Sequence, residues 1–153
     1  GHAGRHGGSI GSRADMLCFG ESFLQGFNAL TWQWERDRLM AEAVGGPVVR
    51  RLMEASGAMN IALAFGLIER DGDALYSTYL ATEGGRLLCR YRRMSTGWKE
   101  FTRTDSHYRK GREAASFLWR GRRFTVALCG DVWVMPERFR LGEDVLLWPV
   151  YCS

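Results

Sequence analysis

The stretch FGESFLQGF, Phe19–Phe27, places a single carboxylate, Glu21, where an apolar segment passes into a loop punctuated by glycine. The residues before it, Asp15–Phe19, are nearly all apolar, which is typical of a strand buried on both faces of a parallel sheet. In α/β folds the carboxyl ends of such strands carry the chemistry. Glu21 is therefore either a functional carboxylate or simply the point where the strand emerges into water, since glutamate is usually exposed.

A second strand end carries complementary chemistry. The apolar run Phe124–Cys129 ends in a thiol, Gly130 permits a sharp turn, and Pro136-Glu137 predicts a helix soon afterwards. A cysteine near a helix N-terminus has its thiolate favoured by the helix dipole, and the backbone N–H groups of the turn can receive an oxyanion. The alternative is a buried structural cysteine. A carboxylate and a thiol at two strand ends favour a catalytic pair.

Helical and strand patterns alternate along the rest of the chain. Helical spacing covers about residues 31–44 and about residues 47–57, and the apolar run at 59–68 predicts a central strand. Glycine turns at 71–73 and 84–85 join that strand to two more, and a hairpin about 120–121 and a last strand at 144–151 follow. We therefore expect one α/β domain over residues 14–153, preceded by a flexible glycine-rich segment, residues 1–13.

The composition and charge pattern argue against nucleic-acid and membrane partners. The chain has 153 residues, 46% of them hydrophobic, and a net charge of +4. Its basic clusters alternate with apolar residues, so we interpret them as solvated strand faces and expect no nucleic-acid partner; they are Arg90, Arg92 and Arg93, and Arg120, Arg122 and Arg123. No apolar run reaches the roughly 18 residues of a membrane span, so no membrane partner is expected.

We interpret the four cysteines as free thiols rather than as metal ligands. They lie in apolar, strand-like surroundings and lack the spacings of a zinc site; they are Cys18, Cys89, Cys129 and Cys152. We therefore expect a reduced, cytoplasmic protein without a bound metal.

Three ordered stretches resemble signatures of the nitrilase, or carbon–nitrogen hydrolase, superfamily. FGESFLQGF resembles the strand that ends in a catalytic glutamate, with Gly20 where proline is commoner. Leu87–Arg93 resembles the strand that ends in Tyr-Arg-Lys, with Arg93 at the lysine position. Cys129-Gly130-Asp131, followed by Pro136-Glu137, resembles the cysteine signature with one extra residue between its parts. The resemblance covers the chain from about residue 14 to its end.

The resemblance implies an activity and a set of site residues. It implies hydrolysis of a non-peptide C–N bond in a small amide-like substrate through a cysteine thioester, without metal or organic cofactor. Cys129 is then the nucleophile and Glu21 the general base. Two cations compete for the lysine role, Arg93 at the matching position and Lys99 in the next loop. We expect the compact ammonium of Lys99 to approach both Glu21 and Cys129, with Arg93 and Gly130 binding the substrate.

The resemblance also implies a fold and leaves two questions open. The family's domain is an αββα four-layer sandwich, and this chain resembles its N-terminal part alone. Members of the family pair through their outer helices, so we expect a homo-oligomer. The family often has a second glutamate before a glycine in the next loop. This chain offers only a loose match to it, in Glu100, Asp105 and Gly111. The alternative function is that of a catalytically inactive nitrilase-like fragment or pseudoenzyme that acts in protein association, which the short chain and Arg93 favour.

Overall fold

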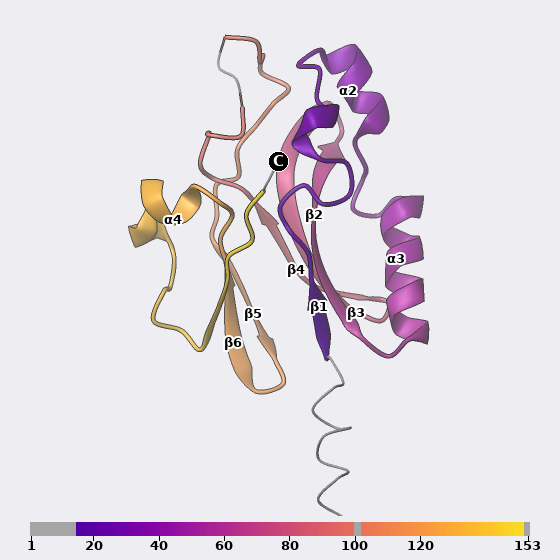
Figure 1. The fold of residues 1–153 in the computed structure, drawn as a ribbon, viewed down its shortest axis with the longest axis vertical. Helices are drawn as coiled ribbons and strands as arrows, with labels where there is room; N and C mark the ends of the chain where they lie inside the picture. The colour runs from indigo at the N-terminus through magenta and orange to yellow at the C-terminus, as the bar shows by residue number, and fades with distance from the viewer. Residues whose placement is uncertain (1–14, 100–101, 152–153) are drawn as a thin grey trace, which may run out of the picture.

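The computed structural model describes residues 15–99 and 102–151, and its strands form two sheets that face each other (Figure 1). The first sheet has the order β1 (Met16–Cys18), β2 (Ala62–Asp71), β3 (Ala74–Glu83) and β4 (Arg86–Arg92). The second has the order β5 (Ala115–Trp119), β6 (Arg122–Val126) and β7 (Val145–Leu147). Strand β1 runs parallel to β2 and β7 parallel to β6, whereas the other neighbours are antiparallel.

Helices lie outside both sheets. The 3₁₀ turn η2 (Phe27–Ala29) precedes α2 (Trp34–Met40) and α3 (Pro47–Ala58), which lie beside the first sheet in Figure 1. The short α4 (Asp131–Val134) and the 3₁₀ turn η3 (Pro136–Arg138) flank the second sheet on the opposite side. The αββα layering expected from the sequence is confirmed, with a fourth layer that is small within the described residues. Across those same residues, no helix combines the length and apolarity needed to cross a membrane.

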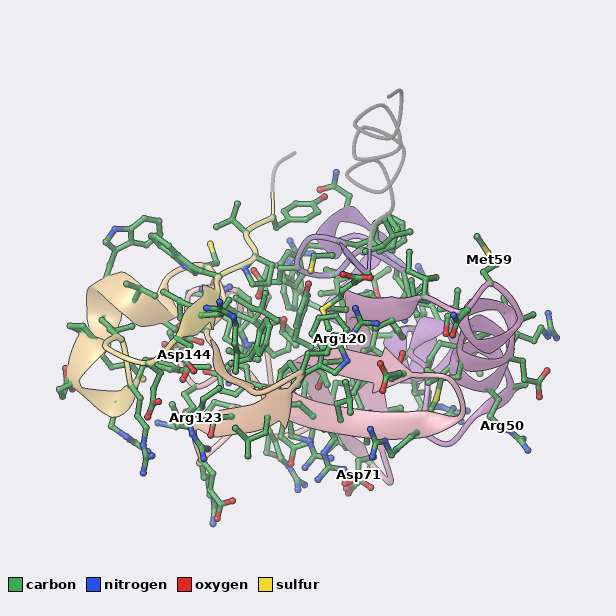
Figure 2. All side chains as sticks on the ribbon, turned by 90° about the horizontal axis from the view of Figure 1, so that it is seen from below. Arg50, Met59, Asp71, Arg120, Arg123 and Asp144 are labelled. Atoms are coloured by element: carbon green, nitrogen blue, oxygen red, sulfur yellow. The ribbon has the colours of Figure 1, made fainter. Side chains whose placement is uncertain are left out.

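Apolar side chains from both sheets form the main core. Tyr79 and Tyr91 of the first sheet pack in one cluster with Phe117, Phe124 and Leu128 of the second. The Phe117 and Phe124 rings stack with centroids 5.1 Å apart. Figure 2 looks along the layers and shows side chains filling the space between them. Each fully buried side chain of this size contributes about 1.5–3 kcal/mol, so the two sheets hold each other in place.

The helix predicted for residues 31–44 is shorter than expected. Helix α2 ends at Met40, because the next residues leave it to pair with β2. The Glu42 N–H donates to the Ile68 carbonyl at 3.0 Å, and the Glu42 carbonyl accepts from the Arg70 N–H at 2.9 Å. Helix α3 meets its prediction closely: it begins at Pro47, where a missing N–H costs nothing, and ends at Ala58.

The prediction that the first strand is buried on both faces is wrong. Within the described residues β1 pairs only with β2, so it forms an edge of its sheet. Leu17 is 39% exposed and Cys18 is also exposed. Strand β7 forms an edge of the second sheet, and its residues are half-buried. The apolar run Asp15–Phe19 therefore marks an edge strand and not a central one.

Candidate active site

Glu21 lies on a loop that packs directly against β2. Gly66 of β2 makes this contact possible, because a Cβ there would lie 2.4 Å from the Ser22 nitrogen and 2.7 Å from the Gly20 oxygen. The Gly66 N–H donates to the Gly20 carbonyl at 3.2 Å, and the Gly66 carbonyl accepts from Leu24 at 3.1 Å. The loop turns the Glu21 side chain inward, where it is 1% exposed. Glu21 is therefore not the point where the strand emerges into water.

The Glu21 carboxylate is held by a cation and a hydroxyl. Nη1 of Arg93 lies 3.0 Å from one carboxylate oxygen and 2.9 Å from the other, and the Ser77 hydroxyl donates to the second at 2.9 Å. Burial raises the pKa of Glu21 above its ordinary value, while the Arg93 charge and the hydrogen bonds from Arg93 and Ser77 oppose that shift. The net direction is upward, which suits a group that must both take and return a proton.

The Arg93 guanidinium spans the distance between Glu21 and the turn that follows Cys129. Arg93 comes directly after β4 and is 5% exposed, and its Nε donates to the Ser95 hydroxyl at 2.8 Å. Its Nη2 lies against two glycines: a Cβ at Gly97 would be 3.2 Å from that atom, and a Cβ at Gly130 would be 3.1 Å from it. The two glycines thus leave the space that a planar guanidinium needs.

Cys129 stands in a strained turn at the end of the β6 segment. Its backbone has a φ of 42°, a left-handed conformation that is uncommon for residues other than glycine. Its N–H donates to the Pro149 carbonyl at 3.0 Å, and its carbonyl accepts from the Trp148 indole at 2.8 Å. Helix α4 begins at Asp131, two residues after the thiol and earlier than Pro136-Glu137 had indicated.

Asp131 holds the Cys129 turn in place through hydrogen bonds. Its buried carboxylate accepts the Leu128 N–H at 2.9 Å and the Ser95 N–H at 2.8 Å, and it also accepts the Tyr91 hydroxyl. The cysteine turn is thereby tied to the segment that follows β4. The sequence marked Asp131 as part of a motif, but two of its partners, Ser95 and Tyr91, lie 36 and 40 residues away in the chain and no local signal identified them.

Lys99 lies in the same region but binds a different partner. Its Nζ donates to the Tyr108 carbonyl at 2.7 Å. Burial, together with the charge of Lys110, lowers the pKa of Lys99. The ion pair with Glu21 that we expected of Lys99 is made by Arg93 instead. Glu100 lies outside the described residues.

One cavity brings the predicted side chains together. It has a volume of about 510 Å³, and its lining includes Glu21, Arg93, Lys99 and Cys129. Aromatic side chains form much of the remaining wall: Phe27, Trp32, Trp98 and Tyr151. Gly130 packs against Arg93 beside this cavity. Residues 15–99 and 102–151 hold no group of three or more His, Cys, Asp or Glu side chains that could bind a metal ion.

Comparisons with known proteins identify the family and the fold. The family model for carbon–nitrogen hydrolases matches residues 7–144. Among solved structures, a CN-hydrolase superfamily protein from Xanthomonas campestris, crystallised with an arsenic adduct in its active site, superposes with a TM-score of 0.71 at 19% identity over 97% of this chain and 58% of that one. A mutant of the Nesterenkonia AN1 amidase, from the nitrilase superfamily, gives 0.69 at 20% identity over 95% of this chain and 55% of that one.

A more distant enzyme shares the same fold. The glutamine-dependent NAD⁺ synthetase from Acinetobacter baumannii gives a TM-score of 0.59 at 19% identity, over 97% of this chain and 28% of that one. A search of curated proteins gives no significant match. The αββα fold is therefore that of nitrilase-superfamily structures. The chain belongs to the carbon–nitrogen hydrolase family, and it spans little more than half the length of the first two structures named above.

Proposed function

We propose that this chain is a cysteine-dependent hydrolase that cleaves the C–N bond of a small amide. The observation that carries the proposal is the single cavity lined by the Cys129 thiol, the Glu21 carboxylate and the Arg93 guanidinium. A thiol nucleophile, a proton carrier and a fixed cation are the groups that acyl transfer through a thioester needs. The proposal adds no metal and no organic cofactor.

The first half of the reaction forms the thioester. Glu21 takes the thiol proton, and the Cys129 sulfur bonds to the amide carbon, whose oxygen becomes an oxyanion. The Gly130 N–H and Nη2 of Arg93, which lies beside Gly130, are the donors we assign to that oxyanion. Glu21 then returns the proton to the amide nitrogen, the C–N bond breaks, and ammonia leaves.

The second half restores the enzyme. Glu21 takes a proton from water, whose oxygen attacks the thioester carbon. The C–S bond then breaks to release a carboxylic acid, and Glu21 gives its proton to the departing Cys129 sulfur. The sum is one amide and one water converted to a carboxylate and ammonium. Arg93 keeps its charge throughout, because a guanidinium does not lose its proton in proteins. We therefore assign the fixed-cation role to Arg93 and leave Lys99 outside the proton transfers.

Ammonia release from a panel of short aliphatic amides tests the proposal. We expect turnover by the unaltered chain and a loss of about 10²–10⁴-fold for Glu21→Gln. Cys129→Ala should abolish turnover, whereas Cys18→Ala should retain it, because the exposed Cys18 lies outside the site cavity. Undiminished turnover in Cys129→Ala or Glu21→Gln contradicts the proposal.

The inactive alternative predicts a different outcome. A mutant of the amidase from Nesterenkonia sp. AN1 shows acrylamide added at its active-site cysteine. We expect acrylamide to modify Cys129 faster than the buried Cys89, whose pKa burial raises to about 11. A chain that acts only in protein association should form no thioester with any amide.

We further propose a cytoplasmic location, a small amide as the partner, and no role in binding nucleic acid or membranes.

A further inference from the structure

Another cavity lies against the second sheet and shares no lining residue with the site cavity. It has a volume of about 300 Å³ and is bounded by β5, β6 and the segment around η3. Its polar lining residues are Ser116, Arg123, Thr125, Arg138 and Arg140, and two alanines complete it. The described residues that line this cavity thus supply three guanidinium groups and no carboxylate. We call it the arginine cavity.

The alternation of side chains along β6 places Thr125 in the floor of the arginine cavity. Phe124 and Val126 belong to the core between the sheets, so Thr125 points to the opposite, outer face. Its partner on β5, Ser116, lines the same cavity. Thr125 is only 2% exposed, and its hydroxyl has no hydrogen-bond partner among the described residues. Because a buried hydroxyl without a partner is costly, a ligand oxygen that reached it would be favoured.

The three arginines around this floor are only partly neutralised. Glu143 is shared by two of them, with Arg140 at 3.4 Å and Arg123 at 3.8 Å. Arg138 donates to a neutral acceptor, the Arg112 carbonyl, at 2.9 Å, and within the described part of the chain it forms no ion pair. One shared carboxylate therefore leaves positive charge at the arginine cavity that an anion would balance.

The alternative is a surface at which water alone meets these charges. The exposed positions of Arg138 and Arg140 agree with it. Asp144 lies beside Arg123 in Figure 2 and accepts its backbone N–H at 2.9 Å, so it contributes a further negative charge there. A solvated surface does not, however, require an unpartnered hydroxyl beneath the arginines. Thr125 is the residue that distinguishes the two interpretations.

A phosphate group matches the donors of the arginine cavity. The planar fork of a guanidinium binds phosphate oxygens in pairs, and a phosphate monoester carries a charge of about −1.5 to −2 near neutral pH. A carboxylate offers a single charge and two oxygens. The volume of about 300 Å³ is at the lower end for small-molecule sites, so a phosphate fits together with a small organic group.

We propose that the arginine cavity binds a phosphate group, either as the free ion or carried by a small metabolite. Arg123, Arg138 and Arg140 surround the phosphate, and the Thr125 hydroxyl contacts it from the floor. The inference goes beyond the proposed hydrolysis and does not depend on it, because none of these side chains lines the site cavity.

Titration calorimetry of the unaltered chain tests the proposal at constant ionic strength. The probes are inorganic phosphate, glycerol 3-phosphate and, as a carboxylate control, acetate. We expect at least one phosphate to saturate a single site and acetate to bind roughly tenfold more weakly or worse. Arg138→Gln should weaken phosphate binding about tenfold or more. Arg122→Gln is the matched control, because it removes the same charge from a residue that does not line the arginine cavity.

Thr125→Val provides a second test that does not alter the charge. The substitution keeps the branched shape and removes the hydroxyl. We expect weaker phosphate binding in this variant. Without phosphate, its melting temperature should equal or exceed that of the unaltered chain, because no hydrogen bond to a described residue is lost.

The relative affinities identify the source of the phosphate. Tighter binding of glycerol 3-phosphate makes an organic phosphate the ligand, and tighter binding of inorganic phosphate makes it the free ion; either result supports the site. No saturable binding of either phosphate, acetate bound as tightly, or equal losses in Arg122→Gln and Arg138→Gln would overturn it. A lower melting temperature with unchanged phosphate affinity in Thr125→Val would show that water alone meets this hydroxyl, which also overturns the proposal.

Discussion

At the scale of single residues, we propose that the charge of Arg93 sets the pH at which Glu21 can act as a base. Burial raises the pKa of Glu21, and the ion pair with Arg93 is the strongest opposing effect. We predict that Arg93→Gln moves the acidic limb of the pH profile of kcat/KM to higher pH, because losing the cation lets burial raise the pKa further. Arg93→Lys should restore part of the shift, since it keeps the charge. The measurement is ammonia release as a function of pH.

The neighbouring arginine provides a control for this effect. Arg92 also pairs with a buried carboxylate, that of Glu69, at 2.7 Å, but it does not line the site cavity. Arg92→Gln therefore loses its ion pairs with Glu69 and Asp71 without removing a contact to Glu21, and its acidic limb should coincide with that of the unaltered protein. An unshifted limb in Arg93→Gln, or equal shifts in the two variants, would contradict the assignment.

The sequence was sufficient to predict two of the strand-end side chains that line the site cavity, Glu21 and Cys129. Glu21 and Cys129 each follow an apolar run, and that pattern is local. It could not decide between Arg93 and Lys99, because the direction of each side chain depends on contacts made after folding. The hydroxyl that holds Glu21 belongs to Ser77, 56 residues away in the chain, and nothing near Glu21 indicates it.

At the scale of elements, Gly66 sets how closely the Glu21 loop approaches β2. We predict that Gly66→Ala lowers the free energy of unfolding by about 1–3 kcal/mol, because its Cβ would lie 2.4 Å from the Ser22 nitrogen. It should also lower turnover, since the loop that carries Glu21 must move. Urea unfolding and ammonia release measure the two effects.

Gly85 is the matched control for this substitution. A Cβ at Gly85 would meet nothing within 4 Å, and its backbone φ is not positive. Gly85→Ala should therefore leave stability nearly unchanged and turnover intact. Equal stabilities of the two alanine variants would show that the loop is not pressed against β2.

Local patterns predicted these elements better where the partner was also local. Strands β2 and β3 are joined by the predicted glycine turn at residues 71–73 and pair antiparallel. Helix α2 was predicted too long, because the backbone of Glu42 pairs with a strand that comes 26 residues later, at Ile68 and Arg70. The exposure of β1 was missed for the same reason: strand hydrophobicity does not reveal how many neighbours a strand has.

At the scale of the whole molecule, the edge strand β1 is a candidate surface for association, since it pairs only with β2 within the described residues. Leu17 of β1 is 39% exposed on such an edge, and an apolar edge strand readily pairs with another chain. We propose that the chain forms homo-oligomers, with a share of higher mass that grows with protein concentration in sedimentation velocity. Leu17→Lys should reduce that share, because charge on an edge opposes pairing.

A helix substitution separates edge pairing from general surface hydrophobicity. Leu39 of α2 is 71% exposed and lies outside both sheets. Leu39→Lys should leave pairing through the β1 edge unchanged, whereas a loss of association in this variant alone would favour pairing through the outer helices. A monomer at every concentration, or an equal effect of the two lysine variants, would contradict association through the β1 edge.

The most direct test of the account is mass spectrometry of the acylated chain. Trypsin should release Cys129 in a peptide of residues 124–138 that contains no other cysteine. After incubation with an amide and an acid quench, the account predicts that this peptide gains the mass of the acyl group and that the peptides with Cys18 and Cys89 do not. Ammonia release without any acyl group on residues 124–138, or acylation that persists elsewhere in Cys129→Ala, would contradict the claim that Cys129 is the nucleophile.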